Sequence, residues 1–104
     1  MWQDIKHSNI ALIEKLVGEY DVWVLEKSPY GKFKIKIYEN SMGRYTGYTN
    51  LKVIDEMGEF KSAVGYGETE EEALGDTLEK YFELVSWKSE WEESDFQCVN
   101  PFEF

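Results

Sequence analysis

The sequence has few of the residues on which catalytic and metal-binding sites usually depend. It contains one histidine, His7, and one cysteine, Cys98, so it can form neither an internal disulfide nor a zinc site with several Cys and His ligands. No serine lies in a nucleophile-elbow motif, and the acids occur in helical runs instead of in a glycine-bearing loop that could bind calcium. We therefore expect no enzymatic activity, no cofactor and no metal.

Long apolar segments are also missing. No run approaches the roughly 18 residues needed to cross a bilayer, and the N-terminal MWQDIKHSN lacks the basic and apolar regions of a secretion signal. Together with the single cysteine, this predicts a cytoplasmic protein that does not associate with membranes. Linkers, repeats and low-complexity segments are absent as well, so residues 1–104 are expected to form one domain.

Positive charge is scarce in the C-terminal third. Residues 1–67 carry nine acids and nine bases, whereas residues 68–104 carry twelve acids and two bases, so the net charge of −10 lies entirely in that last segment. A field of one sign repels nucleic acid and anionic membrane and attracts basic partners. The distribution predicts that the protein binds a basic protein and does not bind nucleic acid directly.

The hydrophobic periodicity predicts an α+β fold. A first helix is expected from about Asn9, capped by Ser8, to Val17, with Gly18 as its stop. After Gly18 the period changes to two, which predicts four antiparallel strands in a meander. These strands are expected at residues 20–25, 32–37, 44–54 and 60–66, with turns at KSPYG, NSMG and DEMGE.

A second helix is predicted after the sheet. Thr69 and Glu72 form a capping box, and an apolar stripe of Leu74, Leu78, Tyr81 and Val85 follows at helical spacing. This long helix should lie across the apolar sheet face, because neither element can bury its own stripe alone. A short acidic and aromatic C-terminal segment follows, where Ser89 and Glu92 suggest a further short helix that would place Trp87 and Trp91 on one face.

Two charged surfaces compete as binding sites. The central strands present a basic strip with interleaved aromatics, formed by Lys32, Lys34, Lys36, Tyr38, Arg44, Tyr48, Lys52 and Lys61. Such a strip has the chemistry of a nucleic-acid platform, or it is the ordinary solvated face of an antiparallel sheet.

The second surface is the acidic C-terminal third, where aromatic side chains accompany the carboxylates. Such anchors surrounded by charge suit a surface that enters a basic groove, although a solvated helix surface has the same composition. The candidate partner-binding residues are Glu70, Glu71, Asp76, Glu79, Glu83, Trp87, Glu90, Trp91, Glu92, Glu93, Asp95 and Phe96.

The segment GYGETEEEALGDTLEKYFELV, residues 65–85, resembles the strand, Gly-x-Thr turn and helix of HicB-like antitoxin domains, and more loosely the end of double-stranded-RNA-binding domains. The resemblance implies a β-β-β-α core. The lysine cluster that opens the RNA-binding helix is replaced here by Glu70, Glu71 and Glu72. In size, charge and aromatic content the chain is also similar in type to the small acidic inhibitors that phages make against defence nucleases, including anti-CRISPR proteins and other DNA mimics.

These observations lead to one expected function and two alternatives. The expected function is non-enzymatic inhibition, in which the acidic third occupies the basic nucleic-acid-binding surface of a partner enzyme. One alternative is an antitoxin or immunity protein that neutralises a cognate toxin through the same surface. The other is a weak nucleic-acid-binding module that uses the basic strip.

Overall fold

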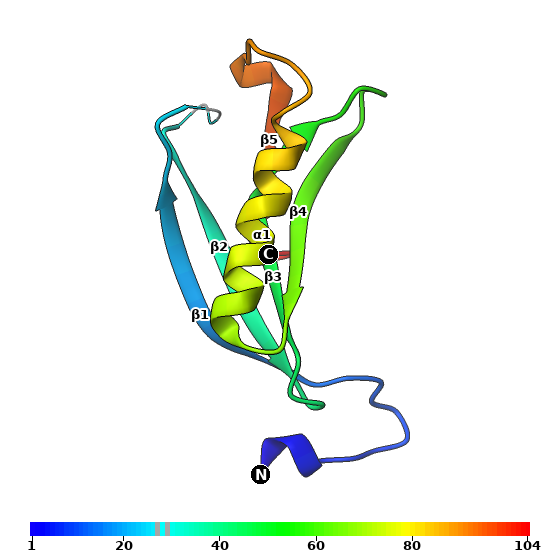
Figure 1. The fold of residues 1–104 in the computed structure, drawn as a ribbon. Coiled ribbons are helices and arrows are strands. Elements are labelled where there is room, and N and C mark those ends of the chain that lie inside the picture. The colour runs from blue at the N-terminus through cyan, green and yellow to red at the C-terminus, as the bar shows by residue number, and fades with distance from the viewer. Residues whose placement is uncertain (27, 29) are drawn as a thin grey trace.

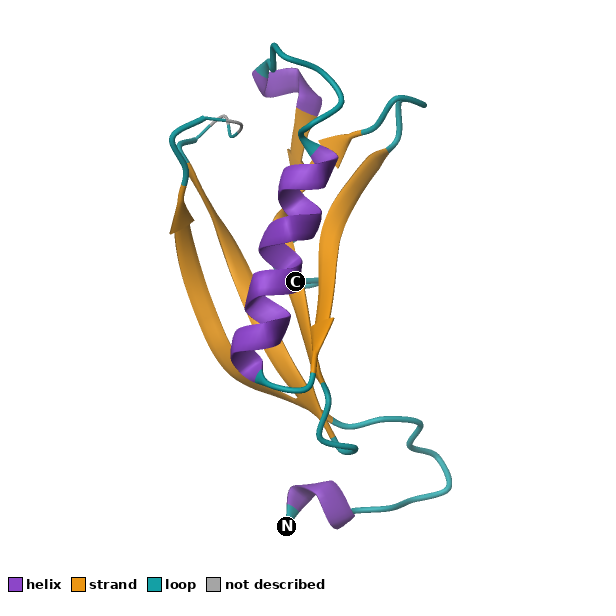
Figure 2. Ribbon diagram, viewed as in Figure 1, coloured by secondary structure: helices purple, strands orange, loops and turns teal. Residues whose placement is uncertain are grey.

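The computed structural model covers residues 1–104 and describes all of them except Lys27 and Pro29, so two residues of the predicted KSPYG turn lie outside the described residues. Its described part is one α-helix packed on an antiparallel sheet (Figures 1 and 2), which confirms the predicted α+β class. The elements in chain order, with η for a 3-10 turn, are η1 (Trp2–Asp4), β1 (Glu14–Trp23), β2 (Lys32–Asn40), β3 (Tyr45–Ile54), β4 (Phe60–Gly67), α1 (Glu70–Leu84), η2 (Glu93–Asp95) and β5 (Phe96–Cys98).

The sheet is an antiparallel meander in the order β1-β2-β3-β4, as the alternating pattern predicts. The turns after β2 and β3 close in the same way. In each, a side-chain oxygen of Asn40 or Asp55 accepts the N–H groups two and four residues further on. Gly43 and Gly58 then adopt φ of 79° and 84°, where a residue with a Cβ would be strained. The NSMG and DEMGE sequences therefore fix where these strands end.

Beyond its midpoint β3 separates from β2. The pairing of β2 with β3 extends no further than Ile35 opposite Thr49, after which β5 pairs with Leu51–Val53. The register between β3 and β4 shifts in the same region. There the Thr49 hydroxyl accepts the N–H of Ala63 and donates to the carbonyl of Leu51, both at 3.0 Å. The hydroxyl thus replaces ladder hydrogen bonds that the irregularity removes.

The predicted second helix forms as α1, and Thr69 caps it by accepting the N–H of Glu72 at 3.1 Å. Its buried stripe is Ala73, Thr77 and Tyr81, with Val85 just beyond the helix end. Leu74 and Leu78, which the sequence assigns to this stripe, are half-buried on its flank. In its first turns the helix is therefore rotated so that the smaller Ala73 and Thr77 face the sheet in place of Leu74 and Leu78.

Two glycines allow α1 to approach the sheet closely. Gly47 and Gly65 pair across β3 and β4. A Cβ on Gly65 would lie 2.2 Å from the backbone nitrogen of Thr77, and one on Gly47 would lie 2.1 Å from Thr77 Oγ1. Tyr81, one turn further along, stacks on Phe33 of β2 with ring centroids 4.1 Å apart. Held by this glycine pair, α1 packs mainly against β4 and β3 (Figure 1) and meets β1 at its first turn, where Glu70 contacts Tyr20.

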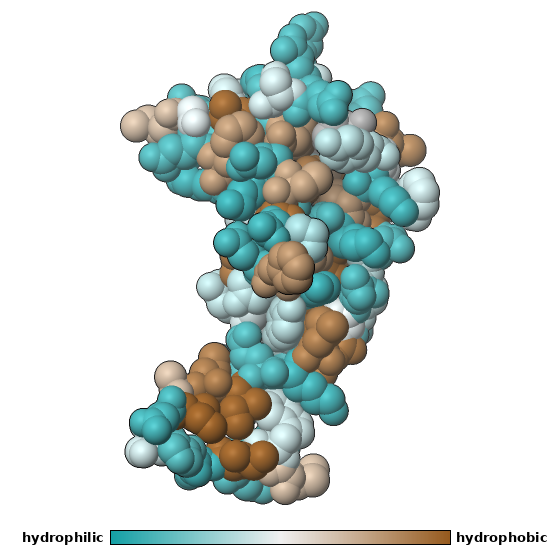
Figure 3. All heavy atoms as spheres, turned by 180° about the vertical axis from the view of Figure 1, so that it is seen from behind, coloured by the Kyte–Doolittle hydropathy of each residue, from teal (hydrophilic) through white to brown (hydrophobic). Residues whose placement is uncertain are grey.

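The helix predicted from Asn9 to Val17 does not form. The chain has only the turn η1 before an irregular segment, and β1 already begins at Glu14. Leu16 and Val17, which fit a helical stripe, lie in β1 because pairing with β2 supplies ladder bonds that outweigh a weak helix propensity. The segment before β1 extends away from the sheet (Figure 1) and gathers apolar side chains at one end of the molecule (Figure 3). Its exposed apolar residues include Ile5, Ile10 and Leu12.

The short helix predicted to start at Ser89 is also wrong. After α1 the structure has the single turn η2, and the cap is shifted by three residues, because the N–H of Glu92 donates to the Asp95 carboxylate at 2.8 Å. β5 follows at once and pairs with β3. Pairing with the sheet leaves too few residues for another helix.

Candidate protein-binding surface

The outer face of α1 is acidic because the inner face is used by the core. With Ala73, Thr77 and Tyr81 buried, the helical period places Glu71, Glu79 and Glu83 on the exposed side. At 1.5 Å per residue, Glu71 and Glu83 are separated by roughly 18 Å along the helix. The exposed carboxylates Glu90, Glu92 and Glu93 follow in the segment after α1.

Three of the candidate acids have structural contacts instead of free carboxylates. Glu70 accepts a hydrogen bond from the Tyr20 hydroxyl, which raises the pKa of that tyrosine. Asp76 accepts the backbone N–H of Tyr66 at 2.8 Å and pairs with Lys80 at 3.1 Å, so its pKa is lowered.

Asp95 is held in a similar way near the end of the chain. It pairs with Lys88 at 2.8 Å, and this contact, together with the N–H of Glu92, lowers its pKa. Lys80 and Lys88, the two bases of residues 68–104, are therefore both engaged by acids that stabilise the fold.

The aromatic side chains of the C-terminal segment pack on the domain itself. Trp91 is half-buried against the core, and its ring lies 5.6 Å from that of Phe96, which is buried. Trp87 contacts Trp91 edge to face at 5.6 Å, and Lys88 Nζ lies 4.8 Å from the Trp91 ring. These contacts give Trp91 and Phe96 a role in stability.

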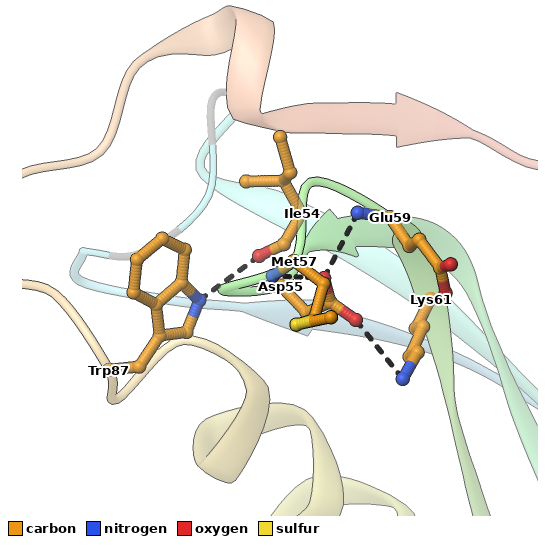
Figure 4. A network of polar contacts seen from close by, with 6 residues as sticks. All are labelled: Ile54, Asp55, Met57, Glu59, Lys61 and Trp87. Atoms are coloured by element: carbon orange, nitrogen blue, oxygen red, sulfur yellow. Dashed lines mark hydrogen bonds and ion pairs between the residues drawn. The ribbon is translucent and has the colours of Figure 1, made fainter.

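Trp87 is the most exposed of the three, at 38%. Its indole N–H donates to the carbonyl of Ile54 at 3.0 Å. In Figure 4 the indole points toward the turn after β3, where Asp55 accepts the N–H groups of Met57 and Glu59 and pairs with Lys61. The polar edge of Trp87 is therefore fixed, while part of its ring remains open to a partner.

Six of the predicted residues remain as exposed carboxylates, and we call them the acidic surface. Among the residues that the structure describes, none of the six forms an ion pair within 4.0 Å. Asp76 and Asp95 differ from them by their ion pairs, and Glu70 differs by its hydrogen bond from Tyr20. Glu92 also takes part in the capping box that opens η2. The acidic surface consists of Glu71, Glu79, Glu83, Glu90, Glu92 and Glu93.

The strand residues of the basic strip that alternate with the buried residues of β2 and β3 lie on the sheet face opposite α1: Lys32, Lys34, Lys36, Tyr38, Tyr48 and Lys52. Lys61 lies on the other face, opposite buried Val53, and pairs with Asp55 at 3.0 Å. Lys34 pairs with Glu19 at 3.7 Å and with Asp21 at 3.3 Å, both from the neighbouring β1. Lys36 Nζ lies 4.5 Å from the centre of the Phe104 ring. Seen from behind in Figure 3, hydrophilic and apolar side chains are interspersed over this face.

The C-terminal tail covers the aromatic part of the same strip. The Tyr38 hydroxyl donates to the Phe104 carbonyl at 3.1 Å, and Tyr38 meets Tyr48 edge to face. A hollow of about 510 Å³ remains between the tail and the sheet, and it is lined by Glu14 and Glu103 as well as by Lys52. The nucleobases of a bound nucleic acid could not stack between these tyrosines without displacing the tail.

Sequence reasoning missed an apolar groove between β1 and α1. The groove has a volume of about 560 Å³, and its apolar lining is Val22, Trp23, Val24, Leu25, Leu78 and Phe82. It exists because the glycine pair holds α1 over β3 and β4, so that beyond its first turn the helix leaves the end of β1 open. The period of the helix could have suggested it, since Phe82 falls outside the buried stripe.

No group of three or more His, Cys, Asp or Glu among the described residues is arranged to hold a metal ion. Within the same part of the chain, no helix is both long and apolar enough to span a bilayer. Comparison with protein-family models, with curated proteins and with solved structures finds no match. What the molecule can bind is therefore argued from the chemistry of its own surface.

Proposed function

We propose that the protein is a non-enzymatic inhibitor whose acidic surface occupies the basic nucleic-acid-binding surface of a partner enzyme. The observation that carries this proposal is the separation of the acids into two groups. Asp76 and Asp95 use the two bases of the C-terminal third, so the acidic surface keeps its full charge for a partner.

The arrangement of these carboxylates supports an interaction driven by charge. A row of like charges on one face attracts a basic partner over a distance of about one Debye length, roughly 8 Å at physiological salt. Half of these carboxylates, Glu71, Glu79 and Glu83, are presented on a helix that the core holds in place, so little conformational entropy is lost there on binding. Small acidic proteins that imitate nucleic acid would use such a row in place of phosphates.

The state of the basic strip argues against the nucleic-acid-binding alternative. Nucleic-acid affinity comes largely from counterion release at phosphates that lysine and arginine neutralise. Here Lys34 is already paired with Glu19 and Asp21, and Lys36 lies against Phe104. Lys61 is paired with Asp55 as well, and the other bases of the strip act against the net charge of −10 of the whole molecule.

The proposal is tested by affinity capture from lysate of the host cell, followed by a competition assay on each captured protein. The full-length chain is compared with Glu90→Gln combined with Glu93→Gln, and with the control Glu56→Gln combined with Glu59→Gln. Both double variants remove two charges, but only the first removes them from the acidic surface. Displacement of a fluorescent DNA or RNA duplex from the captured protein is then measured by anisotropy.

We expect the wild type and the Glu56/Glu59 control to capture the same basic protein and to displace its duplex, with the Glu90/Glu93 variant at least several-fold weaker. The effect should shrink as salt rises, since steering acts on the association rate. The proposal is refuted if the partner binds its duplex and this protein at the same time. Equal capture by both double variants would refute it as well.

A further inference from the structure

We infer that the groove between β1 and α1 is a docking site for an amphipathic helix of the partner, with apolar side chains that enter the groove and lysine or arginine residues that meet Glu26 in the groove and Glu79 and Glu83 in the adjoining hollow. This inference rests on the proposed function and deepens it, because it adds an apolar anchor to a contact otherwise described by charge alone.

The width of the sheet leaves room for a second helix. Four strands spaced about 4.8 Å apart form a surface roughly 15–20 Å wide, whereas one helix is about 10 Å across. The Gly47–Gly65 pair holds α1 over β3 and β4, and the first turn of α1 reaches β1 where Tyr20 donates to Glu70. The part of the sheet that α1 leaves open is therefore the end of β1 near Val22. Packed helices lie about 8–10 Å apart, and a helix placed over β1 would meet this spacing beside α1.

The lining of the groove supplies the apolar contact that such a helix needs. Val22 of β1 and Val24 just after it line the groove and are half-buried, while Leu78 and Phe82 line it from α1. Phe82 is 45% exposed and also borders a second hollow of about 440 Å³ on the outer side of α1. A large apolar ring between two hollows is the kind of position that carries binding energy in protein interfaces.

The charges around the groove indicate the chemistry of the partner. Glu26 lies on the β1 side, and Glu79 and Glu83 border the second hollow. No lysine or arginine lines either hollow among the described residues. The two hollows share Leu78 and Phe82, so the three acids flank one apolar centre from two sides, while Lys32 Nζ lies 4.8 Å from the ring of Trp23 at the edge of the groove. An apolar centre with acids on both sides matches a helix with apolar residues on one face and bases beside them. A second copy of this chain is a poor occupant, since it carries the same acids and a net charge of −10.

The inference is tested with three synthetic helical peptides of one length and pattern, which differ only in composition. The first is built from leucine and lysine, the second from serine and lysine, and the third from leucine and glutamate. Binding to the full-length protein is measured by fluorescence anisotropy, and the contact is mapped from amide shifts in two-dimensional ¹⁵N NMR spectra. We expect the leucine–lysine peptide to bind at least tenfold more tightly than either control, with the largest shifts at Val24, Leu78 and Phe82.

Variants locate the contact independently of the shifts. Phe82→Ser should weaken the leucine–lysine peptide at least tenfold, whereas Met57→Ser, which removes an apolar side chain that is 86% exposed outside the groove, should leave binding unchanged. Thermal melts verify that both variants fold. Glu79→Gln combined with Glu83→Gln should weaken binding more than the Glu90/Glu93 pair does, because only the first pair borders the groove region.

Two results would overturn the inference. Equal binding of the leucine–lysine and serine–lysine peptides would mean that charge acts without an apolar anchor, and unchanged binding by folded Phe82→Ser would place the contact elsewhere. Either result leaves the proposed function standing, because that function fails only in the duplex-displacement assay. Conversely, the leucine–lysine peptide could bind in the groove while the protein displaces no duplex from a captured partner. That result would refute inhibition and leave the inferred docking site standing.

Discussion

The contact between α1 and the glycine pair predicts opposite outcomes for the same chemical change at two positions. In Gly65→Ala the new Cβ would lie 2.2 Å from the Thr77 nitrogen and 2.6 Å from its Cα. Ordinary contact begins near 3.4 Å, so the helix backbone must move by 3.4 minus 2.2, or about 1.2 Å, at the centre of the core. Overpacking of a filled core costs about 1–3 kcal/mol. For a domain of this size we expect Tm to fall by roughly 5–20 °C.

Gly75→Ala, on the exposed side of the same helix, is the matched control. A Cβ there meets nothing within 4 Å, and replacing a helix-interior glycine by alanine stabilises by about 0.5–1 kcal/mol. Thermal and urea denaturation followed by circular dichroism give both free energies of unfolding. The close approach of α1 to the sheet is refuted if Gly65→Ala is as stable as the wild type, or if the two substitutions change the stability in the same direction.

Three further predictions concern the core, the aromatic segment and acid stability. Tyr81→Ala should lower the free energy of unfolding, measured by urea titration, by about 3–5 kcal/mol, and Leu78→Ala should lower it distinctly less. The reason is that Tyr81 is fully buried against Phe33, whereas Leu78 is only half-buried. The reverse order would show that the helix register is wrong. Trp91→Ala should lower Tm while the folded fraction keeps its affinity for the partner, and a loss of affinity at unchanged Tm would contradict the packing described above. The lowered pKa of Asp76 means that its contacts stabilise the fold above the ordinary carboxyl pKa of 3.8, and that this contribution disappears as pH falls through the lowered pKa. Asp76→Asn should therefore lower Tm at neutral pH and make Tm fall less steeply between about pH 5 and 2. A pH profile of Tm equal to that of the wild type would contradict this.

The order of the strands and the capping of α1 could be predicted because their signals are local. Alternating residues such as Phe33, Ile35 and Ile37 specify a strand face, and Thr69 specifies a helix start whatever surrounds it. The N-terminal segment could not be predicted in this way. Leu16 and Val17 fit either period, and the choice was made by pairing with β2, which is a contact between distant parts of the chain.

The candidate surface was predictable only in part, for the same reason. Helical periodicity alone places Glu79 and Glu83 on the outside. Composition cannot show that Phe96 enters the core, since this depends on β5 pairing with β3 beyond the point where β3 separates from β2. Nor can it reveal the groove beside Phe82, which follows from the sideways position of α1.

The hydrogen bond from Tyr66 to Asp76 also has a consequence for how the molecule behaves at high concentration. β4 is an edge strand, and the outward backbone of such a strand is a template on which other chains can add and aggregate. By accepting the Tyr66 N–H, the Asp76 side chain of the covering helix occupies one backbone donor that an added strand would need. Its negative charge, and the Lys80 ammonium beside it, would also have to be desolvated by any strand that approached. The same carboxylate that ties α1 to the sheet therefore protects the open edge from fibril-like addition.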